Sequence, residues 1–432
     1  MAPRLSHTKS RNGCKRCKVR KVKCDEVHPT CNNCKRHGVE CEYVNHFPQQ
    51  AGAAPFPGTH RENGFDQSAG RHASLDLSIQ TPYTDDEIYG MISNADDRRM
   101  LELRLLHHFT SVVSYSFPSS LISEMWRVDA VRLGFEHEFL MNTIFAMSAL
   151  HLARDIPLSP RYHTKDEISL ALAHILNLPK TSLGRIDPVM AHQFYLNLAV
   201  SQQRNALTNI CAENSDALFL SSVLLSYQGL KMLPDGHNPT IEYTPPTAWL
   251  RMANAIRHVS DATIPFLESR YESDDYQCPG VFLASVSEPN FRDRAAIFNP
   301  EHSKPFASLL DWEQFPEPDL DEQSKSAYEQ ALYYIAGVYH ALLDREDPGL
   351  IFRRLISLAP LVPTHFIALV EQGRPRALAI LSLHCAMAKV VDDHWIFHGF
   401  AEREVYGIQS MLPQEWQWAM EWPLALLQQN SP

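Results

Sequence analysis

The chain has 432 residues, a length that suits one small module joined to one large domain better than a single domain. Hydrophobic residues make up 44% and charged residues 21%, as in ordinary globular proteins. No apolar run approaches the roughly 18 residues that span a bilayer, and the polar, basic first residues lack the apolar stretch of a secretory signal. We therefore expect no membrane span and an intracellular protein whose thiols stay reduced.

Charge is unevenly distributed along the chain. The formal net charge is −11, but residues 1–46 carry 11 Lys/Arg against 4 Asp/Glu, whereas the rest of the chain carries 28 against 46. A basic end on an acidic body is typical of a nucleic-acid-binding arm. Six of the nine cysteines lie in the same basic end, so metal binding and DNA binding are both expected there.

The cysteines of the basic end form a repeat. The pattern C-x2-C-x6-C occurs twice and places its members at Cys14, Cys17, Cys24, Cys31, Cys34 and Cys41. Zinc takes four ligands, so six thiolates can serve two zinc ions only if two sulfurs bridge both metals. The two-fold symmetry of the repeat assigns bridging to the equivalent Cys14 and Cys31. A metallothionein-like store would not need the basic residues between the cysteines, and a disulfide knot would need secretion.

The segment from Gly13 to Asp25, together with Pro29 two residues before the fourth cysteine, resembles the fungal Zn(2)-C(6) binuclear cluster family. The resemblance implies two zinc ions, bridging by the first and fourth cysteines, and binding to double-stranded DNA in the nucleus. It also implies that Lys21, four residues after the second cysteine, contacts bases of a CGG-like triplet.

Four cations lie within six residues between the second and third cysteines: Lys18, Arg20, Lys21 and Lys23. Metal ligation can hold so short a segment as a turn of helix, and cations on that turn can reach guanine O6 and N7 in the major groove. With Lys21 at the bases, we expect Lys18, Arg20 and Lys23 to contact phosphate. The alternative is that these cations only form a solvated face. They could also serve as a nuclear import signal, and that use is compatible with DNA contact.

Residues 47–95 are predicted to be a flexible linker. They contain four prolines and five glycines and show no sustained apolar period. Pro48, Pro55 and Pro57 would interrupt a coiled coil directly after the cysteine module, so a homodimer would have to form through the large domain. The predicted division is a DNA-binding module at 1–46, the linker at 47–95, and a large all-α regulatory domain at 96–432.

Helical periodicity supports the all-α prediction for the large domain. Apolar residues recur at helical spacing in 100–109, and residues 139–153 are apolar on nearly every face, which predicts a central core helix. Gly373 and Pro375 predict the end of one helix and the start of the next at 375–391. Seven prolines in 262–320 predict an irregular segment. Further helical stretches are predicted near 163–177, 188–210, 215–230, 246–260 and 321–343.

The large domain also resembles a known group, the regulatory domain of fungal sterol uptake control proteins and their homologues. The resemblance depends on residues 101–109, 135–140, 149–153, 393–400 and 416–423, although Phe400 stands where relatives often carry Trp. It implies a hydrophobic pocket for a small molecule such as a sterol, and control of access to DNA or to the nucleus, including exchange between cytoplasm and nucleus. We expect helices 139–153 and 375–391 to form pocket walls; the ligand-binding residues are unknown at this stage.

Two side-chain sets in the large domain have competing interpretations. His394, His398 and Glu402 are spaced to share a helix face as metal ligands, but ordinary hydrogen-bonded histidines are commoner and Gly399 weakens a helix there. The tryptophans 416, 418 and 422 either line a ligand pocket or pack in the core.

The sequence predicts a sequence-specific regulator of RNA polymerase II transcription that contacts DNA and the transcription machinery. The target genes implied are those of sterol or lipid metabolism or of secondary metabolism. One alternative is a DNA-tethered scaffold or repressor that responds only to protein partners. Another is an enzyme body tethered to DNA, but no catalytic motif is present in a supporting context, so we expect no enzyme.

Overall fold

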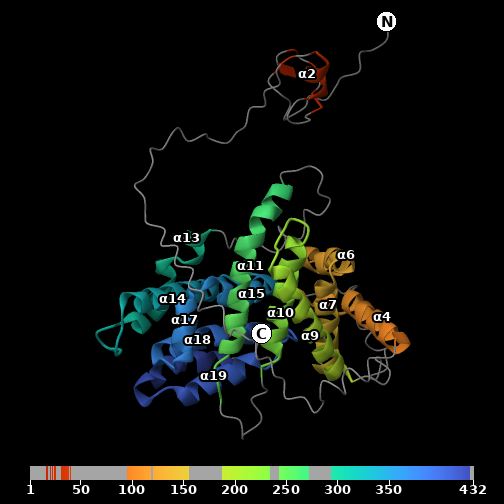
Figure 1. The fold of residues 1–432 in the computed structure, drawn as a ribbon. Coiled ribbons are helices and arrows are strands. Elements are labelled where there is room, and N and C mark those ends of the chain that lie inside the picture. Colours follow the sequence, from red (N-terminus) through yellow and green to blue (C-terminus); the bar gives the residue numbers. More distant parts are fainter. Residues whose placement is uncertain are drawn as a thin grey trace. The chain divides into compact units, whose positions relative to one another are not determined.

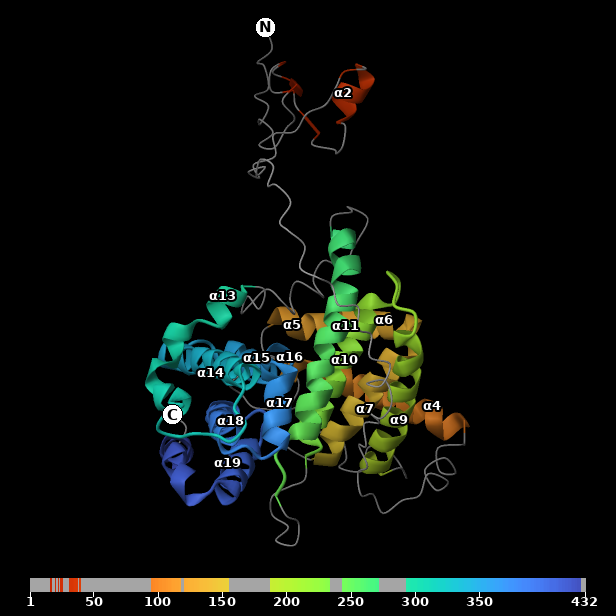
Figure 2. The same cartoon turned by 60° about the vertical axis from the view of Figure 1, so that its left-hand side comes forward.

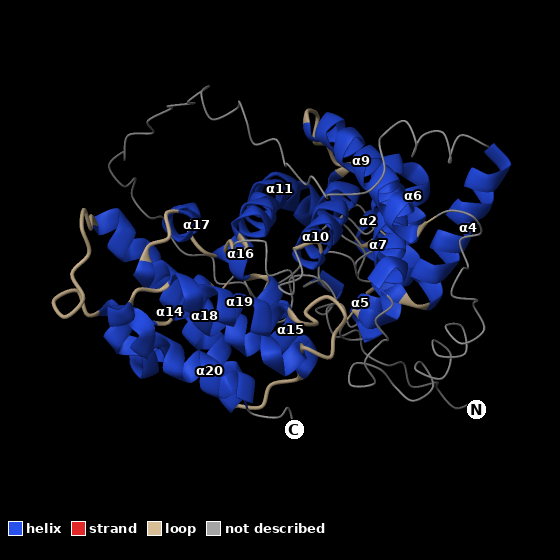
Figure 3. Cartoon of the chain, turned by 90° about the horizontal axis from the view of Figure 1, so that it is seen from below, coloured by secondary structure: helices blue, strands red, loops and turns tan. Residues whose placement is uncertain are grey.

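The computed structural model of the chain describes residues 16–17, 20, 22, 24–25, 31–37, 39, 95–117, 120–154, 187–233, 243–271 and 293–428. The chain divides into two compact units, residues 1–73 and 74–432. All regular structure in the described ranges is helical, which confirms the all-α prediction (Figure 3). The predicted boundaries at 46 and 95 stay a prediction, because residues 47–94 lie outside those ranges.

In the smaller unit, the longest described element is a short helix, α2 (Asn32–Arg36). The α-helices described in the larger unit are α4 (Ala95–Ser111), α5 (Ser120–Glu124), α6 (Val131–Glu136), α7 (Glu138–Arg154), α9 (Pro188–Leu207), α10 (Ser215–Lys231), α11 (Thr247–Tyr271), α13 (Arg294–Ile297), α14 (Glu322–Leu343), α15 (Pro348–Ile356), α16 (Leu358–Leu361), α17 (Thr364–Glu371), α18 (Pro375–Met387), α19 (Phe400–Met411) and α20 (Glu421–Gln428). The 3-10 segments are η1 (Val113–Ser116), η4 (Pro300–Leu310), η5 (Ala388–Val391) and η6 (Gln414–Met420), and η2 (Met125–Ala130) is a π-helix.

The helices of the larger unit form two groups, and α11 lies between them (Figures 1 and 2). On one side α7 packs against α4, α9 and α10; on the other, α18 packs against α14, α17, α19 and α20. α11 contacts α10 from the first group and α16 and α17 from the second. No helix of the described part is long and apolar enough to cross a membrane.

Helix α7 is the central helix of the first group, as predicted. Its residues from Phe139 to His151 are all buried except Met141, because apolar or small side chains occupy every face. Phe145 from α7 and Tyr195 from α9 meet edge to face, with ring centres 5.1 Å apart. The sequence predicted this position because a helix that is apolar all round cannot place a polar face in water.

Helix α18 is the most completely buried helix of the second group, with every side chain from Arg376 to Met387 buried. The turn before it has Gly373 at φ +66°, with its N–H donating to Val370 O (2.9 Å), while the Arg374 N–H donates to Leu369 O (3.1 Å). This left-handed glycine ends α17, and Pro375 begins α18. The predicted helix stop and start are confirmed.

The prediction for residues 262–320 is wrong at its beginning. Helix α11 continues through Pro265 to Tyr271 instead of ending near residue 260. Proline removes one helical hydrogen bond, but the carbonyl that loses its partner belongs to the exposed Asp261 and can bind water. After the undescribed residues 272–292, α13 and η4 are the short elements expected in this region. The helix predicted at 163–177 lies outside the described residues, as does the segment directly after the cysteine module.

Candidate zinc centre and DNA-binding module

The four described cysteines of the smaller unit are buried although their neighbours are exposed. Cys17, Cys24, Cys31 and Cys34 are between 0% and 2% exposed, whereas Arg16, Arg20, Lys35 and Arg36 are exposed. Within the part of this unit that the structure describes, Val39 is the apolar residue packed against these cysteines. So small an apolar cluster supplies little folding free energy, which is the situation in which metal ligation stabilises a module.

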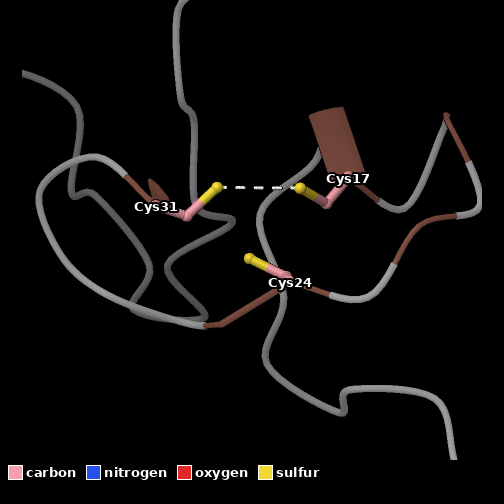
Figure 4. Close-up of side chains that lie close together, drawn as sticks. All are labelled: Cys17, Cys24 and Cys31. Carbon is pink, nitrogen blue, oxygen red and sulfur yellow. Dashed lines mark hydrogen bonds between the residues drawn. The ribbon is translucent and has the colours of Figure 1, made fainter. Parts of the chain in front are cut away.

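Three of these sulfurs converge on one point. The Sγ atoms of Cys17, Cys24 and Cys31 all lie within 4.8 Å of one another, and those of Cys17 and Cys31 are 3.6 Å apart (Figure 4). Two sulfurs on one tetrahedral zinc ion are about 3.8 Å apart, given Zn–S bonds of about 2.3 Å. A disulfide would need about 2.05 Å, so the 3.6 Å between the Cys17 and Cys31 sulfurs is not a disulfide. The donor type, the burial and the spacing therefore all fit zinc.

The two halves of the cysteine repeat have matching backbone geometry. Cys17 O accepts a hydrogen bond from Val22 N (3.1 Å), and Cys34 O accepts one from Val39 N (3.2 Å). Both bonds span five residues, and the second pair lies 17 residues after the first, which is the period of the repeat. The symmetry inferred from the spacing is thus present in the backbone.

Cys31 connects the two halves. Its sulfur lies beside two cysteines of the first half, while it also accepts a hydrogen bond from Cys34 N (3.3 Å) as the N-cap of α2 in the second half. Asp25 adds a second connection, because its carboxylate accepts from Asn32 N at 3.1 and 3.2 Å. Sequence reasoning missed this role of Asp25; an acidic side chain that precedes a short helix was the available signal.

The predicted DNA-contacting residues are only partly described. Arg20 is exposed and lies on a turn in which its own amide donates a hydrogen bond to Arg16 O (3.0 Å). Lys18, Lys21 and Lys23 lie outside the described residues. The predicted ligands Cys14 and Cys41 lie outside them as well. Arg16, Lys35 and Arg36 are further exposed cations. Both halves therefore present positive charge beside the buried sulfurs, the charge sign that phosphate contacts need.

Comparison with known proteins identifies the module. Residues 12–50 match the fungal Zn(2)-Cys(6) binuclear cluster domain. The smaller unit therefore carries a fungal-type zinc cluster domain. The cluster domain of this family binds two zinc ions and DNA, and the family consists of nuclear transcription factors, not enzymes.

Similarity to proteins named Zn(2)-C6 fungal-type transcription factors extends through the larger unit. The Zn(2)-C6 fungal-type transcription factor afumD of Aspergillus fumigatus is 29% identical over 379 residues, 87% of this chain and 84% of the relative. A Zn(2)-C6 fungal-type transcription factor of Gibberella zeae is 27% identical over 99% of this chain and 87% of the relative. Sterol uptake control protein 2 of Candida albicans is 30% identical over 45% of this chain and 24% of the relative.

The larger unit does not bring His394, His398 and Glu402 together as ligands. His394 precedes α19, is 2% exposed, and its Nε2 is 2.6 Å from Ser116 O. Gly399, at φ +76°, separates it from the helix that carries Glu402, whose carboxylate pairs with Lys389. These polar contacts are structural. The two histidines are therefore ordinary hydrogen-bonded side chains and not metal ligands.

The three tryptophans near the C-terminal end pack in the core. Trp416 and Trp418 lie against Phe315, with ring centres 5.2 and 4.9 Å away, and Trp422 lies 5.5 Å from Phe306. The buried Arg376 guanidinium carbon lies 5.2 Å from the ring centre of Trp416. None of the three tryptophans lines the cavity described next, so their ring contacts favour the core-packing interpretation.

A cavity of about 490 Å³ lies elsewhere in the larger unit. Its walls come from η2, α10, α11, α15 and α16, with the neighbouring Phe117, Ile122 and Arg294. The expected walls, residues 139–153 and 375–391, do not contribute, because both segments are enclosed within the two helix groups. The volume is in the range of small-molecule sites, which span about 300–1,000 Å³. Sequence reasoning missed these lining residues because they come from distant segments.

Proposed function

We propose that this chain is a sequence-specific DNA-binding regulator of RNA polymerase II transcription that reads a CGG-like element. The six cysteines Cys14, Cys17, Cys24, Cys31, Cys34 and Cys41 hold the two zinc ions, and Cys14 and Cys31 bridge them. Lys21 reads bases, while Lys18, Arg20 and Lys23 contact phosphate. The module spans residues 1–46 and is joined by a linker at 47–95 to a regulatory domain at 96–432.

One observation carries this proposal: Cys31 belongs by backbone to α2, but its sulfur lies among the cysteines of the first half. A bridging thiolate has to reach both metals, and this position allows it. Zinc ligation would then fix the basic turn that includes Arg20 and hold its cations outward, where they can enter the major groove.

The test is selection of bound duplexes from a random DNA library by the full-length, zinc-loaded chain. Enrichment of a CGG-like triplet is the expected result. Loss of this enrichment in Cys31→Ser but not in Cys211→Ser would show that the enrichment depends on the zinc cluster. Cys211 is a suitable control because it lies outside the cysteine repeat. Binding without any sequence preference would overturn the proposal.

We also propose that the regulatory domain responds to a hydrophobic small molecule, and that the regulated genes serve sterol, lipid or secondary metabolism. The cavity of about 490 Å³ and the similarity to a protein named for sterol uptake control support this part. Ligand binding would change access of the basic module to DNA or to the nucleus, with exchange between cytoplasm and nucleus, and a homodimer would form through the regulatory domain. A partner-regulated scaffold would instead show no ligand-dependent change in DNA binding.

A further inference from the structure

The cavity has an aromatic wall. Phe117 packs against Trp126 and Tyr227, with ring centres 5.1 and 5.6 Å apart, and Tyr227 meets Phe352 at 6.0 Å. All four line the cavity, and Ile256 lines it from α11. Such a wall favours an apolar ligand body, because burial of apolar surface contributes about 25 cal/mol per Å².

The polar lining is unusual for a site that takes a neutral lipid. Three arginines, Arg257, Arg294 and Arg353, line the cavity, against one aspartate, Asp261. Arg353 is only 8% exposed and has its own interactions within the protein, so the positive charge open to a ligand comes from Arg257 and Arg294. A neutral molecule with one hydroxyl would bring no negative charge to Arg257 and Arg294, which Asp261 balances only in part.

Arg257 is held firmly in the wall. Its Nε donates to Pro360 O (2.7 Å) and its Nη2 donates to Val362 O (2.6 Å). These acceptors are neutral carbonyls, so they fix the position of the guanidinium but do not cancel its charge. Burial, and then the positive charge of Arg294, lower the pKa of Arg257, with Asp261 acting in the opposite direction. The two guanidinium groups therefore repel each other, and an anion between them would relieve that repulsion.

Arg294 reaches the cavity from α13. Its guanidinium carbon lies 4.4 Å from the ring centre of Phe298, which supports the side chain against an aromatic face. A guanidinium supported in this way still has N–H groups for two parallel hydrogen bonds to a carboxylate. Arg257 and Arg294 together thus offer a preorganised recognition group for one anionic head.

We propose that the cavity binds an amphipathic anion with a single carboxylate head at Arg257 and Arg294 and an apolar body against Phe117, Trp126 and Tyr227. This deepens the proposed function, on which it rests, by assigning the ligand of the regulatory domain to the chemical class of lipophilic carboxylic acids instead of neutral sterols.

The experiment measures equilibrium binding to the full-length, zinc-loaded chain of four probes: hexadecanoic acid, hexadecan-1-ol, hexadecyl phosphate and ergosterol. The acid is expected to bind at least about 10-fold more tightly than the alcohol, since a hydrogen bond to a charged group exceeds a neutral one by that much. Added salt should weaken binding of the acid more than binding of the alcohol.

Variants separate the head site from the apolar wall. Arg294→Gln is expected to weaken binding of the acid at least about 10-fold and to leave binding of the alcohol unchanged. Lys304→Gln is the matched control, because Lys304 is an exposed cation on η4 that does not line the cavity. Val223→Trp places a larger side chain in the cavity wall and should abolish binding of both the acid and the alcohol.

Equal binding of acid and alcohol, tighter binding of hexadecyl phosphate than of the acid, or binding of ergosterol alone would overturn the carboxylate assignment. Absence of binding by all four probes would overturn the ligand site itself. DNA binding by the same samples is measured in parallel, so failure of the DNA-binding proposal is distinguishable from failure of the ligand proposal.

Discussion

Tyr243 donates a hydrogen bond of 2.6 Å to the fully buried carboxylate of Glu404, although 161 residues separate them. The Tyr243 ring also lies over Gly407, one helical turn later in α19. The segment that leads into α11 is thereby attached to α19, which connects the two helix groups of the larger unit. A side chain at position 407 would occupy the space of the ring.

Gly407→Ala is expected to destabilise the protein by about 1–3 kcal/mol. An added Cβ would lie 2.2 Å from the Tyr243 ring, so the ring would have to move and its bond to Glu404 would be lost. Chemical denaturation with helical circular dichroism measures the effect.

Gly337→Ala is the matched control for this substitution, because the added Cβ in α14 would meet its nearest neighbour at 3.4 Å. Alanine also has the higher helix propensity, so this control should be neutral or slightly stabilising. Equal loss of stability in the two variants would contradict the role given to the Tyr243 ring.

Removal of zinc is expected to abolish DNA binding and leave the helical signal of the larger unit unchanged. Among the described residues of the smaller unit, the buried cluster is four cysteines with the partly buried Val39 packed against them, so we expect metal to supply most of the folding free energy. Metal analysis of the untreated chain should give two zinc ions, and chelator titration followed by DNA binding measures the loss. A single zinc ion per chain, or DNA binding that survives chelation, would be inconsistent with the bridged cluster.

Lys21→Ala and Lys23→Ala are expected to affect DNA binding differently. If Lys21 reads a base, its loss should weaken the binding free energy on the preferred site by about 1–3 kcal/mol and reduce the sequence preference. If Lys23 contacts phosphate, its loss should weaken all sequences similarly and reduce the slope of log K against log salt by about 1. Titrations at several salt concentrations on specific and scrambled duplexes measure both. The assignment fails if the two variants give the same pattern.

Acid is expected to destabilise the larger unit through His192. Burial lowers the pKa of His192 from 6.5 to about 4, although its Nε2 contacts Gln228 Oε1 at 3.2 Å. Above pH 6.5 both the folded and the unfolded states hold the imidazole neutral, and below it the unfolded state binds the proton first. The free energy of unfolding should therefore fall between about pH 6.5 and pH 4, by up to about 1.4 kcal/mol per pH unit for this group.

His192→Gln should make this pH dependence shallower, because the substituted side chain binds no proton. His258→Gln is the control, since His258 is exposed on α11. Unfolding measured by denaturant at several pH values gives the slopes. An unchanged slope in His192→Gln would assign the acid sensitivity to other groups.

Short-range patterns in the sequence predicted several features correctly. The cysteine repeat predicted a two-fold symmetry, and the matched hydrogen bonds of Cys17 and Cys34 show it, because identical spacing around metal ligands leads to identical turns. The apolar faces of 139–153 and the pair Gly373 and Pro375 predicted a core helix and a helix boundary, because φ/ψ preference and side-chain periodicity are local properties.

By itself, then, the sequence determined the metal-binding class, the basic end and the all-helical body of this protein. Only the tertiary structure decided where the cavity lies, that Arg257 and Arg294 both line it, and that His394 bonds to Ser116, 278 residues away. It also decided that α11 continues through Pro265. The physical reason is that these features depend on packing and desolvation between segments far apart in the chain, and no local pattern specifies which distant helix faces will meet.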